Sequence, residues 1–311
     1  MNLEKIRGQD RALSHLEKLL SSKPMPQSLL FFGPEGVGKS LAARETAKAL
    51  LCSEARPDRR PCGTCPSCIS AERGLQPDIK IVDAAYQATL REEDVSKQKT
   101  LRVDTIRYLR HDMSLNSLLG GFKVAVVEDA DKLEIEAANA LLKIIEEPPP
   151  GTFWLLTSSR PGRLPPTIAS RCLRISFADL EADLIFELLT ERGVARDKAR
   201  ELSTICEGSI GRALELAQEE NSIPFANTDP SALIKAAELL GTELAPARRK
   251  VSAALWAATQ KLRLKYLNGE TAFSRVEKPL RDIEWLKRAL ESNVDPKTVF
   301  LLAGQAVEEA Q

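Results

Sequence analysis

The sequence predicts an α/β fold in which helices cover a parallel sheet, followed by segments that are entirely helical. Short apolar runs alternate with amphipathic stretches as far as Phe177, which is the pattern of parallel strands joined by crossover helices. From Ala178 onward, apolar residues recur at helical spacing and strand-like runs disappear. A chain of 311 residues has room for two or three domains of roughly 100–200 residues each.

The composition is that of a globular protein with substantial apolar cores, since 43% of the residues are hydrophobic and 28% are charged. The formal net charge is zero, so contact with nucleic acid would need a local basic patch. No apolar run approaches the roughly 18 residues of a membrane span, and the N-terminus has no signal-peptide core. We therefore expect a cytoplasmic protein without a membrane partner.

The apolar pattern places the elements as follows. The expected strands are residues 28–32, 79–82, 123–127, 153–157 and 173–177. The helices expected between them are residues 40–51, 103–115 and 135–146. The helices expected after them are residues 180–192, 197–206, 211–218, 231–240, 246–267 and 281–291. Breaks near Gly208 and across residues 221–230 divide the chain into expected domains 1–177, 178–220 and 221–311.

A phosphate-binding loop joins the first expected strand to its helix. Residues 33–40 fit GxxxxGK[ST] between a strand and a helix, a context that makes the match specific. The glycines allow tight turns that aim backbone N–H groups at phosphate. Lys39 is expected to reach the β- and γ-phosphates of ATP or ADP, and Ser40 to hold Mg²⁺. The expected nucleotide-binding residues here are Gly33, Gly36, Val37, Gly38, Lys39 and Ser40. A plain glycine turn, the alternative, leaves Lys-Ser at this offset unexplained.

Two acids, Glu128 and Asp129, follow the apolar run at residues 123–127. The end of a buried strand is where a P-loop fold places the carboxylates that hold magnesium and orient water. We therefore add both acids to the expected nucleotide site. A solvated acidic strand end is the alternative interpretation.

Four of the six cysteines cluster at Cys52, Cys62, Cys65 and Cys68. In a cytosolic chain this pattern indicates metal before disulfides. Four thiolates suit tetrahedral Zn²⁺ and leave no position for water, so a structural zinc is expected. Four free thiols in a loop are the alternative. The other two cysteines, Cys172 and Cys206, are expected in the core.

Several further segments resemble bacterial clamp-loader subunits, a family of AAA+ proteins. They are residues 6–9 (Ile-Arg-Gly-Gln), 137–149, 153–159 and 170–172 (Ser-Arg-Cys). The resemblance covers about Leu3 to Leu216, and the C-terminal third only by its helical character. It implies an AAA+ domain with a zinc module at residues 52–68, a helical lid domain and a helical collar domain for oligomerisation. It also implies that Ser158 is the polar sensor of the nucleotide site.

Two subunit types of this family fit the chain, the gamma/tau-type ATP-hydrolysing motor and the delta-prime-type stator. In AAA+ proteins Asp normally precedes Glu in the acidic pair, whereas here Glu128 precedes Asp129, whose shorter side chain is expected to fall short of the attacking water. In motors an arginine follows the third residue of the segment 208–214. Here Gly211 takes that place and Arg212 comes one later, which rotates the side chain by roughly 100°. Both departures favour the stator, with weak or absent ATPase activity.

The intact phosphate-binding loop supports the motor, which stays one alternative. An AAA+ protein outside replication is another. In the stator interpretation Arg171 is the catalytic residue, an arginine finger acting on the ATP of a neighbouring subunit. Such a finger is worth about 10³–10⁵ in rate. Alternatively, Arg171 caps or pairs at the strand start. The implied partners are the gamma/tau and delta subunits of the DNA polymerase III holoenzyme, the sliding clamp, and primed DNA through the complex.

Overall fold

The computed structural model describes residues 3, 5–21, 24–218, 229–241, 244–292 and 294–309. The chain forms two compact units, Met1–Leu184 with Gly208–Gly211, and Ile185–Glu207 with Arg212–Gln311. The domain boundary expected at residue 220, and most of the break expected across residues 221–230, lie outside the described residues. The division into three domains therefore stays a prediction.

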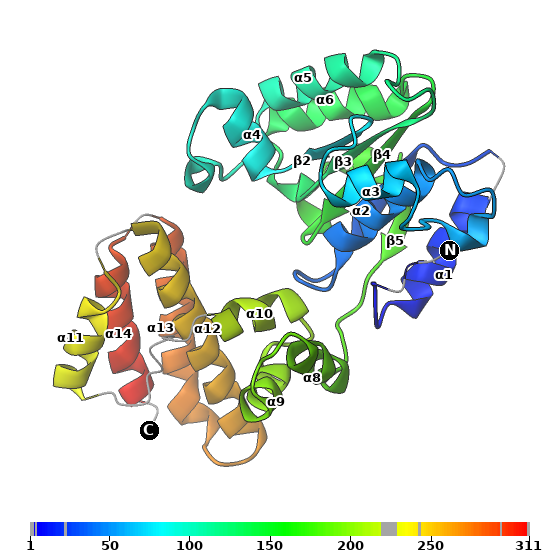
Figure 1. Ribbon diagram of the computed structural model, residues 1–311. Helices are drawn as coiled ribbons and strands as arrows, with labels where there is room; N and C mark the ends of the chain where they lie inside the picture. The colour runs from blue at the N-terminus through cyan, green and yellow to red at the C-terminus, as the bar shows by residue number, and fades with distance from the viewer. Residues whose placement is uncertain are drawn as a thin grey trace. The chain divides into compact units, whose positions relative to one another are not determined.

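The first unit is built on a sheet of five parallel strands in the order β2-β3-β4-β1-β5 (Figure 1). The strands are β1 (Ser28–Phe32), β2 (Ile79–Val82), β3 (Lys123–Val127), β4 (Thr152–Ser158) and β5 (Leu173–Ser176). The predicted parallel-sheet α/β fold is thus confirmed, and each strand end lies within one residue of its predicted position. Because all strands run the same way, their carboxyl ends meet at one edge of the sheet.

Helices separate the strands along the chain. They are α1 (Asp10–Ser21), α2 (Lys39–Leu50), α3 (Pro66–Glu72), α4 (Ala84–Arg91), α5 (Val103–Ser114), α6 (Ile135–Glu146) and α7 (Pro166–Ala169). The sequence pattern predicted α2, α5 and α6, whereas α1, α3, α4 and α7 were not predicted individually. Short elements such as α7 are too brief to show helical periodicity.

Both faces of the sheet are covered by helices. Because successive side chains of a strand point to opposite faces, alternate residues enter two different cores. On β4, Trp154 and Leu156 join residues of α5 and α6 in one core. Phe153 and Leu155 join residues of α1 and α2 in a second core. This two-sided burial explains why the strands read as continuous apolar runs.

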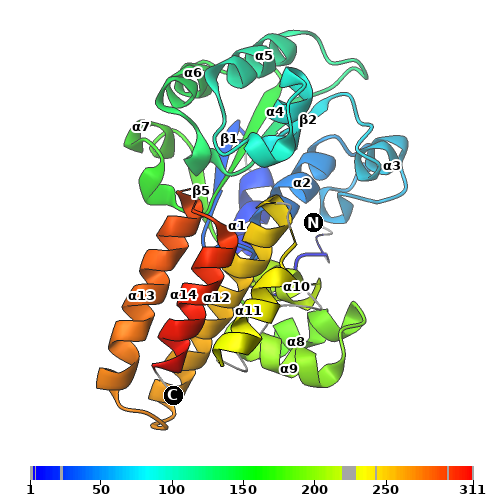
Figure 2. The ribbon, with the colours of Figure 1, turned by 90° about the vertical axis from the view of Figure 1, so that its left-hand side faces the viewer.

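The second unit is helical in its described residues. Helix α8 (Ala182–Glu191) leads into α9 (Arg196–Ile205), α10 (Ile210–Gln218), α11 (Pro230–Glu238), α12 (Leu244–Leu267), α13 (Phe273–Glu291) and α14 (Pro296–Glu308). Helices α12, α13 and α14 pack side by side, with α11 against α14 (Figure 2). None of the helices in the described ranges is long and apolar enough to cross a membrane.

Helix α13 corrects one expectation, because it begins at Phe273 rather than at Arg281. It continues through Pro279, where a proline removes one helical hydrogen bond. Val276 and Ile283 on either side are fully buried in the core of the bundle, and this burial offsets the local cost. Helix α14 was not predicted as a separate helix.

Candidate nucleotide and metal sites

The phosphate-binding loop connects the carboxyl end of β1 to the first turn of α2, which contains Ser40. Gly33, Gly36 and Gly38 have φ values of 147°, 74° and 101°, which glycine adopts without strain. A Cβ on Gly33 would lie 2.3 Å from the carbonyl oxygen of Phe177. Gly38 caps α2 and has no side chain, so the N–H groups of the first turn can receive an anion.

Gln9 fixes this loop to the end of β5. Its buried side-chain amide donates hydrogen bonds to the carbonyl oxygens of Val37 at 3.4 Å and Ala178 at 2.7 Å. Its own side-chain oxygen accepts from the N–H of Ala178 at 3.1 Å. Gly33 donates its N–H to the carbonyl oxygen of Ser158 at 3.3 Å. The loop is therefore held from both neighbouring strands, β4 and β5.

Lys39 lies between the loop and the acids that follow β3. Its ammonium donates a hydrogen bond to the carbonyl oxygen of Pro34. Burial lowers the pKa of Lys39, while the nearby carboxylates of Asp129, Glu35 and Asp131 favour its charged form. The structure thus brings the predicted lysine and the predicted acidic turn to the same edge of the sheet.

Glu128, the acid expected to hold Mg²⁺, is already paired with a cation. Arg44 of α2 donates its Nε–H to Glu128 Oε1 at 2.7 Å, and its Nη2 lies 3.9 Å from Asp83. The hydrogen bond to Glu128 raises the pKa of Arg44. A metal at this carboxylate would lie beside the positive guanidinium. The role of Glu128 as a Mg²⁺ ligand stays a prediction.

The acidic turn also contacts β4, through a residue that the sequence did not single out. Asp129 adopts a left-handed conformation with φ of 50°, and its N–H donates to Thr157 Oγ1 at 3.0 Å. Ser158, the expected sensor, is fully buried, and its Oγ accepts from the N–H of Arg160 at 3.2 Å. The side chains of adjacent strand residues point to opposite faces of the sheet. The side chain of Thr157 therefore contacts the acidic turn, whereas that of Ser158 points to the other face.

Gly211, which belongs to the first unit, packs directly on the phosphate-binding loop. Gly211 donates its N–H to the carbonyl oxygen of Gly36 at 2.9 Å. A Cβ on Gly211 would lie 2.9 Å from Gly36 Cα, so the position at which the resemblance leads us to expect an arginine in a motor has no room for a side chain. The next residue, Arg212, places its guanidinium 4.8 Å from the centre of the Trp256 ring.

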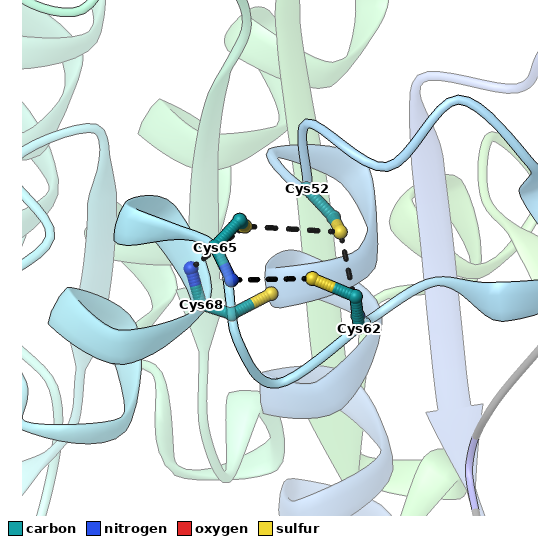
Figure 3. Close-up of side chains that lie close together, drawn as sticks. All are labelled: Cys52, Cys62, Cys65 and Cys68. Atoms are coloured by element: carbon teal, nitrogen blue, oxygen red, sulfur yellow. Dashed lines mark hydrogen bonds between the residues drawn. The ribbon is translucent and has the colours of Figure 1, made fainter.

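The four clustered cysteines converge between α2 and α3 (Figure 3). Their sulfur atoms all lie within 4.8 Å of one another. Tetrahedral Zn²⁺ with bonds of about 2.3 Å needs separations of about 3.8 Å. The cluster can therefore hold a zinc ion after a small contraction.

Hydrogen bonds in the cluster favour the thiolate form of two of the cysteines, Cys62 and Cys65, whose pKa values are lowered. Backbone N–H groups donate to sulfur from Cys62 to Cys52, from Cys65 to Cys62 and from Cys68 to Cys65, at 3.4, 3.3 and 3.4 Å. Burial acts to raise the pKa of Cys65, but hydrogen bonds from Ser53 and Cys68 outweigh it and lower the pKa to about 6. Burial raises the pKa of Cys68 to about 12, so a bound cation is needed to ionise all four thiols.

Arg171 lies at the opposite edge of the sheet from the phosphate-binding loop. It lies in the turn just before β5, in which Leu173 pairs with Leu29 of β1, so Arg171 lies near the amino end of β1, where Gln27 precedes the strand. From Gln27 to Gly33 a strand rises roughly 20 Å at about 3.3 Å per residue. The structure therefore does not bring Arg171 to the chain's own loop.

The remaining cysteines are both buried, as expected. Cys172, next to Arg171, belongs to the core that contains α5 and α6, and burial raises its pKa to about 12. Cys206 lies at the end of α9. Neither is part of the four-sulfur cluster.

The sequence matches known proteins over the unit that carries these sites. The model of the family described as "DNA polymerase III, delta subunit" matches residues 8–181. A DNA polymerase III subunit delta' from Bacillus subtilis is 30% identical over 212 residues, which are 68% of this chain and 60% of the relative. A subunit delta' from Pseudomonas aeruginosa is 39% identical over 146 residues, covering 47% of this chain and 41% of the relative.

Other relatives carry a different subunit name. A DNA polymerase III subunit tau from Bacillus subtilis is 33% identical over 182 residues, covering 58% of this chain and 30% of the relative. The match thus spans less than a third of the length of that tau protein. A solved structure of a gamma-subunit-related protein from Thermotoga maritima superposes with a TM-score of 0.55 at 15% identity, over 96% of this chain and 100% of that one. At this identity the likeness shows a shared fold.

Proposed function

Because the chain belongs to the bacterial DNA polymerase III clamp-loader family of AAA+ proteins, we propose that it is the delta-prime-type stator of a clamp loader. In this role it helps to load the sliding clamp onto primed DNA in the cytoplasm. Its partners are the gamma/tau and delta subunits, and it meets DNA through the complex. Its own contribution to chemistry is Arg171, presented to the ATP of a neighbouring subunit.

The observation that carries this proposal is the position of Arg171. Its side chain is 42% exposed at the amino edge of the sheet, whereas the chain's phosphate-binding loop is at the carboxyl edge. The roughly 20 Å between them, estimated from strand rise, prevents Arg171 from acting on a nucleotide bound by its own chain. If it acts on a phosphate, that phosphate belongs to another molecule.

The geometry of the chain's own loop supports nucleotide binding with little turnover. The three glycines and the start of α2 can receive the phosphates of ATP or ADP. Gly211 lies against Gly36, so no arginine at that position can reach a γ-phosphate. Glu128 is held by Arg44. Of the residues expected to accelerate hydrolysis in a motor, the arginine is thus replaced by Gly211, and the acid Glu128 is paired with Arg44.

The cysteine cluster contributes to this proposal as a structural module. It would hold Zn²⁺ through Cys52, Cys62, Cys65 and Cys68. Four sulfur ligands fill a tetrahedral site, so the ion would stabilise the segment between α2 and α3 and would take no part in a reaction.

The test is reconstitution of the clamp loader with wild-type chain or with Arg171→Ala. We expect the variant to fold and assemble normally, because an exposed arginine contributes little stability. ATP turnover stimulated by clamp and primed DNA should fall, because the cation that matches the transition state is missing. Arg171→Lys should not restore it fully, since an ammonium lacks the planar fork. Unchanged turnover in assembled complexes would refute the proposal.

The gamma/tau-type motor is distinguished by a simpler assay on the isolated chain. The left-handed glycines of the phosphate-binding loop favour this second candidate. The stator should bind ATP or ADP in a Lys39-dependent way with little hydrolysis. Steady turnover that Lys39→Ala abolishes would instead identify a motor.

A further inference from the structure

Arg171 does not extend freely into solvent. Its Nη2 lies 2.8 Å from Glu146 Oε1, and its Nη1 donates to the carbonyl oxygen of Thr167 at 3.2 Å. These contacts come from α6 and α7, two elements that pack against each other. Two different nitrogens of the planar guanidinium are thus contacted, one by a carboxylate and one by a backbone carbonyl, which restricts where the group can lie.

The elements that supply these contacts are themselves fixed. Ile144 and Ile145, which precede Glu146 in the last turn of α6, are buried in the sheet core. Cys172, which follows Arg171, is buried in the same core. Both ends of the ion pair are therefore anchored by neighbouring apolar side chains, while the side chains of Arg171 and Glu146 are 42% and 39% exposed.

Such a half-exposed ion pair contributes little to the stability of the fold. Its physical effect is instead on the arginine side chain, which has many rotamers when unrestrained and loses that freedom on binding a phosphate. A finger held in one conformation beforehand avoids this entropy loss, and a small misplacement of such a group has a large effect on rate.

We propose that Glu146 is a positioning residue for Arg171, one that orients the guanidinium toward the neighbouring subunit's nucleotide. This inference rests on the proposed function. The guanidinium has five N–H donors. Among the described residues it forms an ion pair with Glu146 and donates a hydrogen bond to the carbonyl oxygen of Thr167. The other donors remain for a phosphate.

The experiment compares ATP turnover of clamp loaders reconstituted with wild-type chain, Glu146→Gln, Glu146→Ala and Arg171→Ala. We expect both Glu146 variants to lower kcat by about three- to tenfold, less than Arg171→Ala, with unchanged KM, because orientation matters in the transition state and not in ATP binding. Glu147→Gln is the matched control. Glu147 is also exposed at the end of α6 and should behave as wild type.

A double variant separates positioning from a general structural effect. If Glu146 acts through Arg171, adding Glu146→Ala to Arg171→Ala should cause no further loss. Fully additive losses of ATP turnover in the double variant would overturn the inference and leave the proposed function standing. The same conclusion would follow if the Glu146 variants turned over ATP at least as fast as wild type while Arg171→Ala was slow. Unchanged turnover with Arg171→Ala would overturn both. Size-exclusion chromatography confirms assembly of each complex.

Discussion

Gly211 and Gly36 meet backbone to backbone, with the N–H of Gly211 donating to the carbonyl oxygen of Gly36 at 2.9 Å. The two residues are far apart in the sequence, yet each occupies the space in which a side chain on the other would lie. This contact lies within the first unit and joins residues 208–211 to the loop that is proposed to bind phosphate.

Replacing Gly211 by alanine should disturb the phosphate-binding loop. The new Cβ would lie 2.9 Å from Gly36 Cα, and backbone must move to accept it. Overpacking of this kind costs about 1–3 kcal/mol, more than the helix propensity gained. Urea unfolding measures the loss, and binding of a fluorescent ADP analogue should weaken in parallel. Gly162→Ala is the control, because a Cβ there meets no atom within 4 Å. Wild-type stability of Gly211→Ala would contradict the contact.

The cysteine cluster should hold one zinc per chain, measured by elemental analysis of the purified protein. Cys65→Ser should lose the metal and lower the melting temperature, because metal-binding free energy contributes to folding. Cys206→Ser should keep the zinc, since Cys206 lies outside the cluster. A folded chain that is purified without metal and is not stabilised by added zinc would refute the site.

The ion pair between Arg44 and Glu128 should contribute measurably to stability. Arg44→Gln leaves Glu128, whose side chain is 14% exposed, without its partner. We expect a loss of about 1–2 kcal/mol in the free energy of unfolding, and a coupling energy of about 1 kcal/mol in a double-mutant cycle with Glu128→Gln. Arg56→Gln, which removes an exposed pair with Asp58, should have no measurable effect. Additive losses at Arg44 and Glu128 would show that the two side chains do not interact.

Cys172 should make stability depend on pH in the alkaline range. Burial raises its pKa from 9.0 to about 12. Because the folded-state pKa is the higher one, the unfolded thiol ionises first as pH rises. The contribution to stability is therefore present in full below about pH 9 and is lost as the pH rises toward 12. The difference in unfolding free energy between wild type and Cys172→Ala should narrow over this range. A constant difference from pH 8 to pH 11 would show that the thiol is not shielded.

The strands and the phosphate-binding loop could be predicted because their causes are local. Continuous apolar runs require burial on both faces, and glycines at 33, 36 and 38 permit the left-handed turns that the structure contains. Helix α6 was predicted with the bounds it has, because its apolar residues recur at helical spacing. Helix α13 was predicted too short, because a proline usually marks the end of a helix. The helix continues through Pro279 because the residues on either side of it are buried in the bundle core.

Residue types and their spacing along the chain determined the fold class, the phosphate-binding loop, the acidic pair and the set of four cysteines. Only the tertiary structure decided which distant residues meet. It paired Glu128 with Arg44, Asp129 with Thr157, Gly211 with Gly36, and Arg171 with Glu146. The reason is that the hydrogen bonds and ion pairs of the sites depend on separations of about 3 Å, and these are set by how helices pack on the sheet, which spacing along the chain does not encode.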